Sequence, residues 1–241
     1  MNGFRAVADF LHALAVVLLL GKILKAKTVN GISGKSQILF ALTYTCRYFD
    51  VYVIYLSLYN TLMKAFYLSA FYLALYLIFI HYRSNEASEQ DSFRFEFLVL
   101  GCALVTIVYP YQLDAFRGFV PPPFDVIFEL FWEFSIYLEA VAIIPQLYML
   151  RNVKIDNSMT CYLLALATYR GLYIGNWIYR YNHEGYYDPL ATVCGCIYVM
   201  IYVAFFLYRL QTKEERSARL KAQVYERIPP IPVDSKIKPY M

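Results

Sequence analysis

The feature that most constrains this chain is a series of long apolar runs that covers nearly its whole length. The runs occupy residues 4–24, 37–58, 60–80, 95–112, 124–148, 158–179 and 188–209. A helix of about 20 apolar residues is long enough to cross the hydrocarbon core of a bilayer. With 60% hydrophobic residues and a mean hydropathy of +0.44, the chain is too apolar for an ordinary soluble domain. The sequence therefore predicts an all-α membrane protein with seven transmembrane helices.

The basic residues predict how these helices are oriented. An odd number of spans places the two termini on opposite sides of the membrane. Lysine and arginine are concentrated after the first, third, fifth and seventh runs, and cytoplasmic loops carry such an excess. We therefore expect a luminal N-terminus and a cytosolic C-terminus. The net charge of +4 follows from this bias and indicates no nucleic-acid partner.

The chain divides into a membrane domain, residues 1–209, and a tail, residues 210–241. The first run contains Arg5, Asp9 and His12, so we expect it to remain as a helix and not to act as a cleaved signal peptide. The tail begins with an amphipathic pattern and ends in a proline-rich segment that we expect to be disordered. All five cysteines lie within apolar runs and no histidine accompanies Cys194 and Cys196, so we expect no disulfide framework, metal or cofactor.

The segment 169–188, YRGLYIGNWIYRYNHEGYYD, is the most unusual part of the sequence. Cations, hydrogen-bond donors and aromatic rings share one face of the predicted helix: Tyr169, Tyr173, Asn176, Trp177 and Arg180. A charged residue inside a membrane span costs roughly 2.5–3.5 kcal/mol and is a functional-site candidate by default. This face is suited to binding an anionic ligand.

Further charged residues lie inside the first three runs. Arg5, Asp9 and His12 are spaced to share a helical face, and a histidine beside carboxylates can sense pH between 5 and 8. Arg47 and Asp50 either pair with each other or face a cavity, and we favour the cavity because nothing in the sequence near them neutralises either. We expect Lys64, near the luminal end of the third run, to extend its ammonium to the membrane surface.

The fifth run is unusually acidic for a membrane span. Glu129 and Glu133 lie one turn apart and repel each other unless a cation or a proton intervenes, and the ring of Trp132 suits a cation. Glu139 lies deeper, where Arg170 of the sixth run could pair with it as an internal latch. These arginines and carboxylates together predict a polar cavity that could hold a short peptide with acidic groups, one basic residue and a free C-terminus. Composition alone does not single out that ligand.

Several motifs, in order, resemble the KDEL receptors, which are ER lumen protein-retaining receptors. The motifs are MNxFR at the N-terminus, NGISGKSQ (30–37), RYxD (47–50), SLYNTxMK (57–64), DSFRFEFL (91–98), FSIYLEAVAIIPQL (134–147) and YRGLYIGNWIYRY with EGYYD. The resemblance covers residues 1–209. It implies a fold similar to SWEET and PQ-loop transporters, in which a linking helix joins two three-helix units.

The resemblance also implies a function and a location. Such a receptor binds the C-terminal Lys-Asp-Glu-Leu-like tetrapeptide of escaped ER proteins in the mildly acidic Golgi. It returns them to the ER in COPI vesicles and releases them at neutral pH, which places it in ER and Golgi membranes. The main alternative is a small-molecule transporter of the same fold, carrying a sugar or an amino acid. No nucleophile–base arrangement indicates an enzyme.

The resemblance further implies roles for individual residues. Arg47 would take the terminal carboxylate of the signal, Arg5 and Arg180 its acidic side chains, and Glu129 with Trp132 and Asp50 its basic first residue. The remaining roles are pH sensing by His12, a network that rearranges on binding (Glu139, Tyr169, Arg170), pocket lining (Tyr173, Asn176, Trp177) and a link to transport (Asp188).

Three departures from the family pattern affect these expectations. Ala204 replaces an acidic residue associated with retrieval. Glu133 replaces a small polar residue, which could strengthen a preference for a basic first residue, and the luminal loop before the fifth run is longer than usual. Lys236 and Lys238 lie near the C-terminus, but their spacing is not that of a standard dilysine coat signal.

Overall fold

A computed structural model describes residues 2–83, 89–111, 118, 120–151, 153 and 155–227; for residues 52 and 216–227 it describes the backbone alone. The described residues form helices and turns and contain no strand, which confirms the all-α prediction. The proline-rich end of the tail, with Lys236 and Lys238, lies outside the described residues.

The helical segments follow the predicted runs closely. They are α1 (Gly3–Ala26), α2 (Gly34–Arg47), η1 (Phe49–Tyr52), α3 (Leu58–Tyr76), η2 (Leu77–His81), α5 (Glu96–Val108), α6 (Phe124–Val141), α7 (Ile144–Leu150), α8 (Asn157–Glu184) and α9 (Pro189–Arg227). Within the described residues, three stretches are long and apolar enough to cross a membrane: Gly3–Ala26, Leu58–His81 and Pro189–Glu215. The full count of seven spans stays a prediction.

Side-chain caps explain where several helices begin. Asn2, Ser33, Ser57 and Asp156 each accept a hydrogen bond from the backbone N–H three residues later. Such a cap satisfies one of the four N–H groups that a helix start leaves without a partner in the helix. Each cap lies just before a predicted run, so the sequence encodes these starts locally.

Two of the predicted runs are interrupted, and only the second interruption has a local signal in the sequence, a proline. The run 37–58 is α-helical only to Arg47, continues as the short 3-10 helix η1, and has no regular secondary structure over residues 54–57. The run 124–148 breaks between α6 and α7, because Pro145 has no N–H to donate to the carbonyl of Val141. The first interruption places Asp50 on a turn instead of a regular helix.

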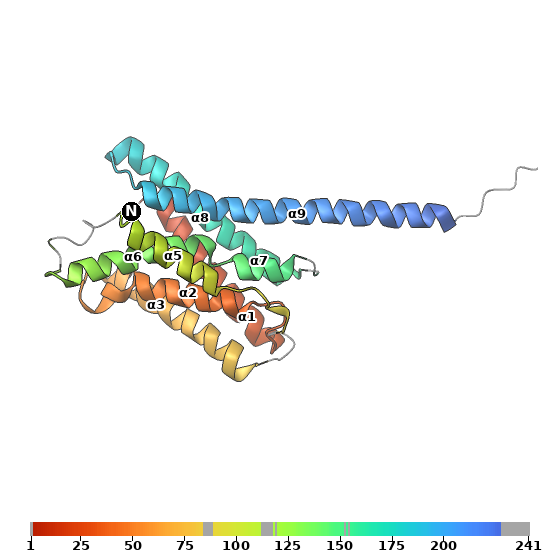
Figure 1. Ribbon diagram of the computed structural model, residues 1–241, viewed down its shortest axis with the longest axis horizontal. Helices are drawn as coiled ribbons and strands as arrows, with labels where there is room; N and C mark the ends of the chain where they lie inside the picture. The colour runs from red at the N-terminus through yellow and green to blue at the C-terminus, as the bar shows by residue number, and fades with distance from the viewer. Residues whose placement is uncertain are drawn as a thin grey trace, which may run out of the picture. The chain divides into compact units, whose positions relative to one another are not determined.

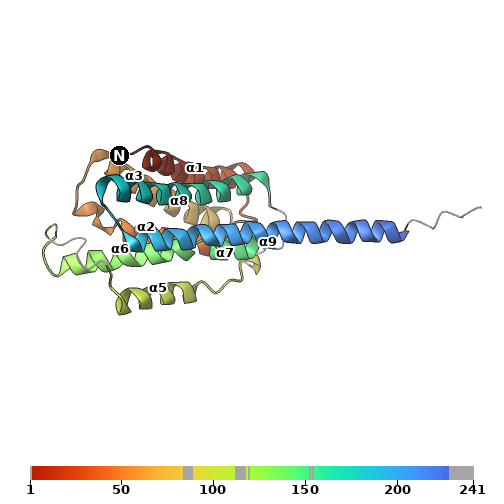
Figure 2. The same cartoon turned by 90° about the horizontal axis from the view of Figure 1, so that it is seen from above.

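The structure separates the chain into two compact units, residues Met1–Tyr202 and Val203–Met241. In the first unit α1 packs along α8, and α2 packs between α3 and α6 (Figures 1 and 2). Helix α5 lies against α6. The first part of α9 contributes Tyr198 and Tyr202 to the buried interior of this unit.

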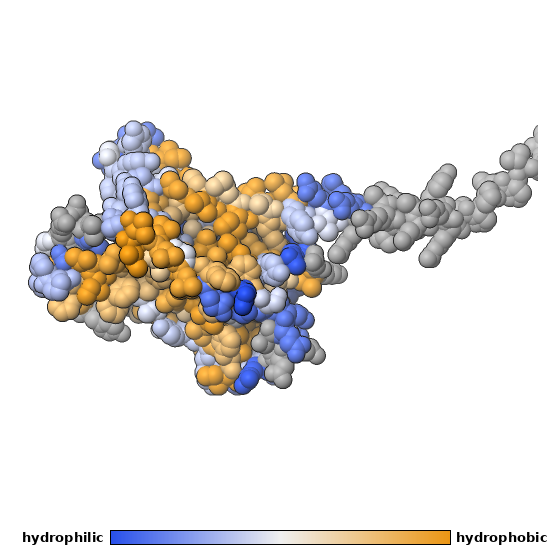
Figure 3. Space-filling model, in the orientation of Figure 1, coloured by the Kyte–Doolittle hydropathy of each residue, from blue (hydrophilic) through white to orange (hydrophobic). Residues whose placement is uncertain are grey.

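The distribution of polarity is that expected in a membrane. Large apolar side chains are exposed on most helices, and they cover much of the face seen in Figure 3. The interior instead contains fully buried tyrosines, among them Tyr44, Tyr169, Tyr198 and Tyr202. A lipid-facing surface needs no polar groups. Each polar group that is buried in the interior, in contrast, needs a hydrogen-bond partner. The fully buried tyrosines meet this need by bonding to each other and to Glu139, whereas other tyrosines, such as Tyr72 and Tyr76, are exposed.

Candidate ligand-binding site

Two neighbouring cavities open inside the first unit. The inner cavity has a volume of about 320 Å³ and lies between α1, α2, α3, α6, α8 and α9. The outer cavity, of about 820 Å³, is lined at the ends of these helices and by the turns beside them. Both volumes fall in the range of about 300–1,000 Å³ that is common for ligand pockets. The two cavities share five lining residues: Arg5, Arg47, Tyr48, Trp132 and Asp188.

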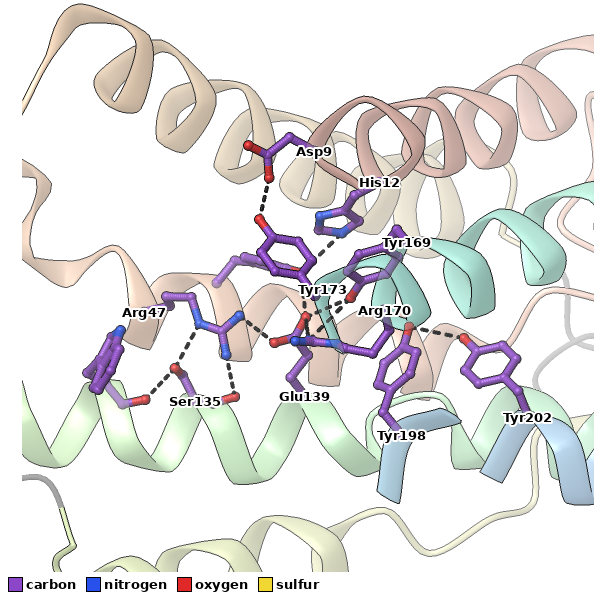
Figure 4. A network of polar contacts seen from close by, with 12 residues as sticks. Asp9, His12, Arg47, Ser135, Glu139, Tyr169, Arg170, Tyr173, Tyr198 and Tyr202 are labelled. Carbon is purple, nitrogen blue, oxygen red and sulfur yellow. Dashed lines mark hydrogen bonds and ion pairs between the residues drawn. The ribbon is translucent and has the colours of Figure 1, made fainter. Parts of the chain in front are cut away.

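Glu139 of α6 is the centre of the inner cavity's polar network. It forms ion pairs with Arg47 of α2 and Arg170 of α8 (Figure 4). Its Oε1 also accepts hydrogen bonds from the hydroxyls of Tyr44, at 3.1 Å, and Tyr169, at 2.7 Å. The predicted pairing of Glu139 with Arg170 is thus present, and its role as a latch stays a prediction. With Glu139 only 2% exposed, two arginines share one buried carboxylate, and this group carries a net positive charge.

Arg47 is further held by Ser135, one helical turn before Glu139. Its Nε donates to Ser135 Oγ at 3.1 Å, and one terminal nitrogen donates to the Ser135 carbonyl at 3.1 Å. Ser135 and Tyr44 were not among the residues that the sequence predicted for the site. The spacing of Ser135 and Glu139 on one helical face could have pointed to Ser135, whereas nothing distinguished Tyr44 among the 25 tyrosines.

His12 lies buried beside this network. Its ring is stacked between Tyr67 and Tyr169, with centroid distances of 4.5 and 4.3 Å. Its Nε2 is 3.1 Å from the hydroxyl of Tyr44, which in turn donates to Glu139. A change in the charge of His12 would therefore act on Glu139 through a single hydroxyl.

Arg5 and Asp9 are close, as predicted, but their contact is loose. The shortest distance between them, from Arg5 Nε to Asp9 Oδ2, is 3.9 Å. The Asp9 carboxylate instead accepts hydrogen bonds from the hydroxyls of Tyr173 and Tyr59. The Arg5 side chain is 51% exposed and lines both cavities, which leaves its guanidinium accessible to a ligand.

Asp50 is neutralised by Lys64, contrary to the sequence-based expectation. Both oxygens of Asp50 accept from the Lys64 ammonium, at 2.8 and 2.7 Å. Lys64 is 6% exposed, so the expectation that it extends to the membrane surface is wrong. The reason is that η1 brings Asp50 within reach of α3, and a buried pair is more stable than a lone buried charge. Both residues still line the outer cavity, together with Arg47, as the cavity interpretation of Arg47 and Asp50 predicted.

Other candidate residues are divided between the cavities and their surroundings. Tyr173 and Trp177 line the inner cavity, and Trp132 and Asp188 line both. Trp177 is packed against Gly195, where a Cβ atom would approach its ring to 2.5 Å, so α9 needs glycine at this point. Asp188 also caps α9 by accepting from the N–H of Ala191.

Glu129, Asn176 and Arg180 are not among the described residues that line either cavity. Glu129 is buried in α6. Asn176 accepts a hydrogen bond from the Asn2 side chain. Arg180 pairs with Glu184, and its guanidinium carbon lies 3.8 Å from the centroid of the Tyr186 ring. Their assignment to the ligand stays a prediction.

Comparison with known proteins decides the family. A family model described as "ER lumen protein retaining receptor" matches residues 28–180. The chain belongs to this family. The receptor is 46% identical to ER lumen protein-retaining receptor erd-2.2 of Caenorhabditis elegans over 86% of its own length and 92% of that protein. It is 44% identical to ER lumen protein-retaining receptor 3 of Danio rerio, over 86% and 91% of the two chains.

The match extends beyond the segment covered by the family model. The receptor is 40% identical to the ER lumen protein-retaining receptor of Drosophila melanogaster over 92% of its own length and 99% of that protein. The family is one of receptors, which confirms the resemblance seen in the motifs and the prediction that the chain is not an enzyme. Family membership and the apolar helices together indicate a membrane protein of the ER and Golgi.

Proposed function

We propose that this receptor retains ER luminal proteins by binding a C-terminal Lys-Asp-Glu-Leu-like tetrapeptide in the two cavities. The observation that carries the proposal is the set of three arginines in the lining of the inner cavity, where Arg47 and Arg170 share Glu139 and Arg5 stands exposed. A ligand with several carboxylates could bind these guanidiniums, because Arg47 and Arg170 share one carboxylate and Arg5 contacts Asp9 only loosely. The names of the relatives above, all retaining receptors, support the same reading.

Arg47 is the group best suited to the terminal carboxylate of the signal. A guanidinium binds a carboxylate through two parallel hydrogen bonds, which selects a free carboxyl end over an amide. Arg47 already holds Glu139, and Arg170 remains beside Glu139 when a ligand takes Arg47. The ligand carboxylate would therefore exchange with Glu139 at Arg47 without leaving Glu139 uncompensated.

The remaining residues of the signal would bind in the outer part of the site. Arg5 and Arg180 would hold the acidic side chains. Glu129, with Asp50 and the face of Trp132, would hold the basic first residue. Because Asp50 is already paired with Lys64, that basic residue would have to share or displace the Lys64 ammonium. Tyr173, Asn176 and Trp177 would shape the wall.

His12 would make the binding depend on pH. The charged and titratable groups around it are Glu139 on α6, Arg47 on α2, Arg170 on α8, and the hydroxyls of Tyr44, Tyr67 and Tyr169. A proton on His12 would add a third cation to a group with one carboxylate. The acidic signal would then bind more tightly in the Golgi, and it would be released when His12 loses its proton in the ER.

The finer features of the family follow as part of the proposal. The fold would pair two three-helix units through a linking helix, as in SWEET and PQ-loop transporters. The N-terminus would be luminal, and the cytosolic face would engage the COPI coat. Glu139, Tyr169 and Arg170 would rearrange on binding, and Asp188 would couple binding to transport despite Ala204.

The test is binding of the tetrapeptide to purified receptor at mildly acidic and neutral pH, with a C-terminally amidated peptide as control. Arg47→Ala should weaken binding at least about 30-fold, which corresponds to a lost charge pair of about 2 kcal/mol. Arg47→Lys keeps the charge but not the paired donors and should also bind more weakly. Arg94→Ala, an exposed arginine away from both cavities, is the matched control.

Two results would contradict the proposal. If Arg47→Ala binds the peptide as well as the parent, the carboxylate does not bind at Arg47. If the free and amidated peptides bind equally, the site does not recognise the terminal carboxylate. Absence of any peptide binding to the parent receptor would leave the small-molecule transporter as the working hypothesis.

A further inference from the structure

Glu133 is a buried carboxylate that the proposed tetrapeptide site does not use. It lies on α6 one turn before Tyr137 and is 1% exposed. It is not among the described residues that line either cavity, so the expectation that it helps hold the basic residue of the signal has no support from the geometry. Its position in the helix directs it instead toward the end of α5.

The contacts of Glu133 fix the chain just after α5. Its Oε1 accepts a hydrogen bond from the backbone N–H of Tyr111 at 3.1 Å. The hydroxyl of Tyr137 also bonds to the Glu133 carboxylate. A buried carboxylate with such partners is costly to leave unsatisfied, so it holds its partners in place. The ring of Tyr111 stacks on Tyr109, with centroids 5.9 Å apart, which further restricts it.

Tyr111 lines the outer cavity together with other aromatic and apolar side chains. These are Tyr48, Leu56, Trp132, Tyr186 and Tyr187. Asp50 and Lys64, which also line this cavity, neutralise each other. Much of the wall away from the arginines is thus neutral and aromatic. Aromatic side chains bind other rings and long aliphatic chains well, and the tyrosine hydroxyls can stay hydrogen-bonded to water.

The proposed function places the basic first residue of the tetrapeptide at Asp50 and Trp132, which line the outer cavity. The residues that precede the tetrapeptide would therefore lie in or beside this cavity. We propose that the aromatic wall of the outer cavity around Tyr111 is a subsite for the one or two residues that precede the tetrapeptide, selecting aromatic or long aliphatic side chains. Glu133 is the positioning residue that holds Tyr111 in this wall. This inference rests on the proposed function.

The experiment compares six-residue peptides that share one tetrapeptide and differ only before it. One peptide carries phenylalanine at the residue immediately preceding the tetrapeptide, one carries glycine and one carries aspartate. The parent receptor should bind the phenylalanine peptide about 3- to 10-fold more tightly than the glycine peptide, the size of one aromatic contact. The aspartate peptide should show no such gain.

Variants at two positions separate positioning from general damage. Glu133→Met, which cannot accept a hydrogen bond, should lose the preference for phenylalanine and still bind the bare tetrapeptide with parental affinity. Glu133→Gln should keep the preference, because its amide oxygen can accept from the Tyr111 N–H. Tyr111→Ala, a change at an exposed side chain, should lose the preference even if Glu133→Met fails to fold.

The outcomes separate this inference from the proposed function. Equal binding of the phenylalanine and glycine peptides by the parent overturns the subsite while the tetrapeptide still binds. A preference that survives in Tyr111→Ala overturns the role of this wall, and one that survives in a folded Glu133→Met overturns the positioning role. Failure of the bare tetrapeptide to bind overturns the proposed function, and the subsite with it.

Discussion

The buried pair of Asp50 and Lys64 provides the sharpest test of the structure. The Lys64 ammonium reaches both oxygens of Asp50, at 2.8 and 2.7 Å, and the two residues are 6% and 8% exposed. At an effective dielectric constant of about 20, unit charges 2.8 Å apart attract by about 6 kcal/mol. Desolvation of both groups offsets much of this, but removing one partner leaves the other charge buried, at a cost of about 3–5 kcal/mol.

Lys64→Met is the variant that measures this cost. Methionine keeps the length and the packing of the lysine stem but cannot neutralise Asp50. We expect the free energy of unfolding to fall by about 3–5 kcal/mol and the melting temperature by roughly 6–20 °C, at about 2–4 °C per kcal/mol for a domain of this size. Adding Asp50→Asn should recover most of the loss, because the variant then buries no unpaired charge.

The assay is thermal unfolding of purified receptor in one detergent, followed for the parent, both single variants and the double variant. Lys25→Met, at an exposed position in the last turn of α1, is the control and should stay within about 0.5 kcal/mol of the parent. A melting temperature for Lys64→Met within about 1 °C of the parent would refute the reasoning. So would a double variant no more stable than Lys64→Met alone, since the coupling between the two sites would then be absent.

Two further predictions concern pH. His12→Gln keeps a hydrogen-bond partner for Tyr44 but cannot gain charge. The ratio of signal affinities at acidic and neutral pH should therefore fall toward one. An unchanged ratio would mean that another group titrates. On the predicted cytosolic side, burial raises the pKa of the Asp91 carboxyl above its ordinary value of 3.8, against hydrogen bonds from Lys35 and Ser33 that lower it. Asp91 therefore stabilises the fold most at acidic pH and loses this contribution as pH rises through its raised pKa. The melting temperature of the parent minus that of Asp91→Asn should therefore fall as pH rises through the raised pKa. A difference that grows as pH rises would contradict the assignment.

The sequence identified most of the residues that the structure brings together. Intramembrane charge is rare enough that each arginine and carboxylate within an apolar run stood out, and helical spacing grouped Arg5, Asp9 and His12 on one face. The pairing of Glu139 with Arg170 was also predicted, and the structure contains it. Family motifs then supplied roles that spacing alone could not.

The pairings between distant helices were harder to predict. One alternative from the sequence was an ion pair between Arg47 and Asp50. In the structure Arg47 pairs with Glu139, and Asp50 pairs with Lys64. The difference arises because α2 ends at Arg47, so Asp50 lies on a separate turn and points elsewhere. An apolar pattern does not register such a break, since a turn among buried residues has the same composition as a helix.

The sequence by itself therefore determined the apolar runs, the helix starts at their capping residues and the inventory of charge inside the membrane. Each of these depends on neighbours within a few residues. Only the tertiary structure decided which side chains meet: Ser135 with Arg47, Lys64 with Asp50, and Glu133 with the backbone of Tyr111. Those contacts depend on the rotation and axial position of each helix against the others, which packing of the whole bundle sets and no local pattern records.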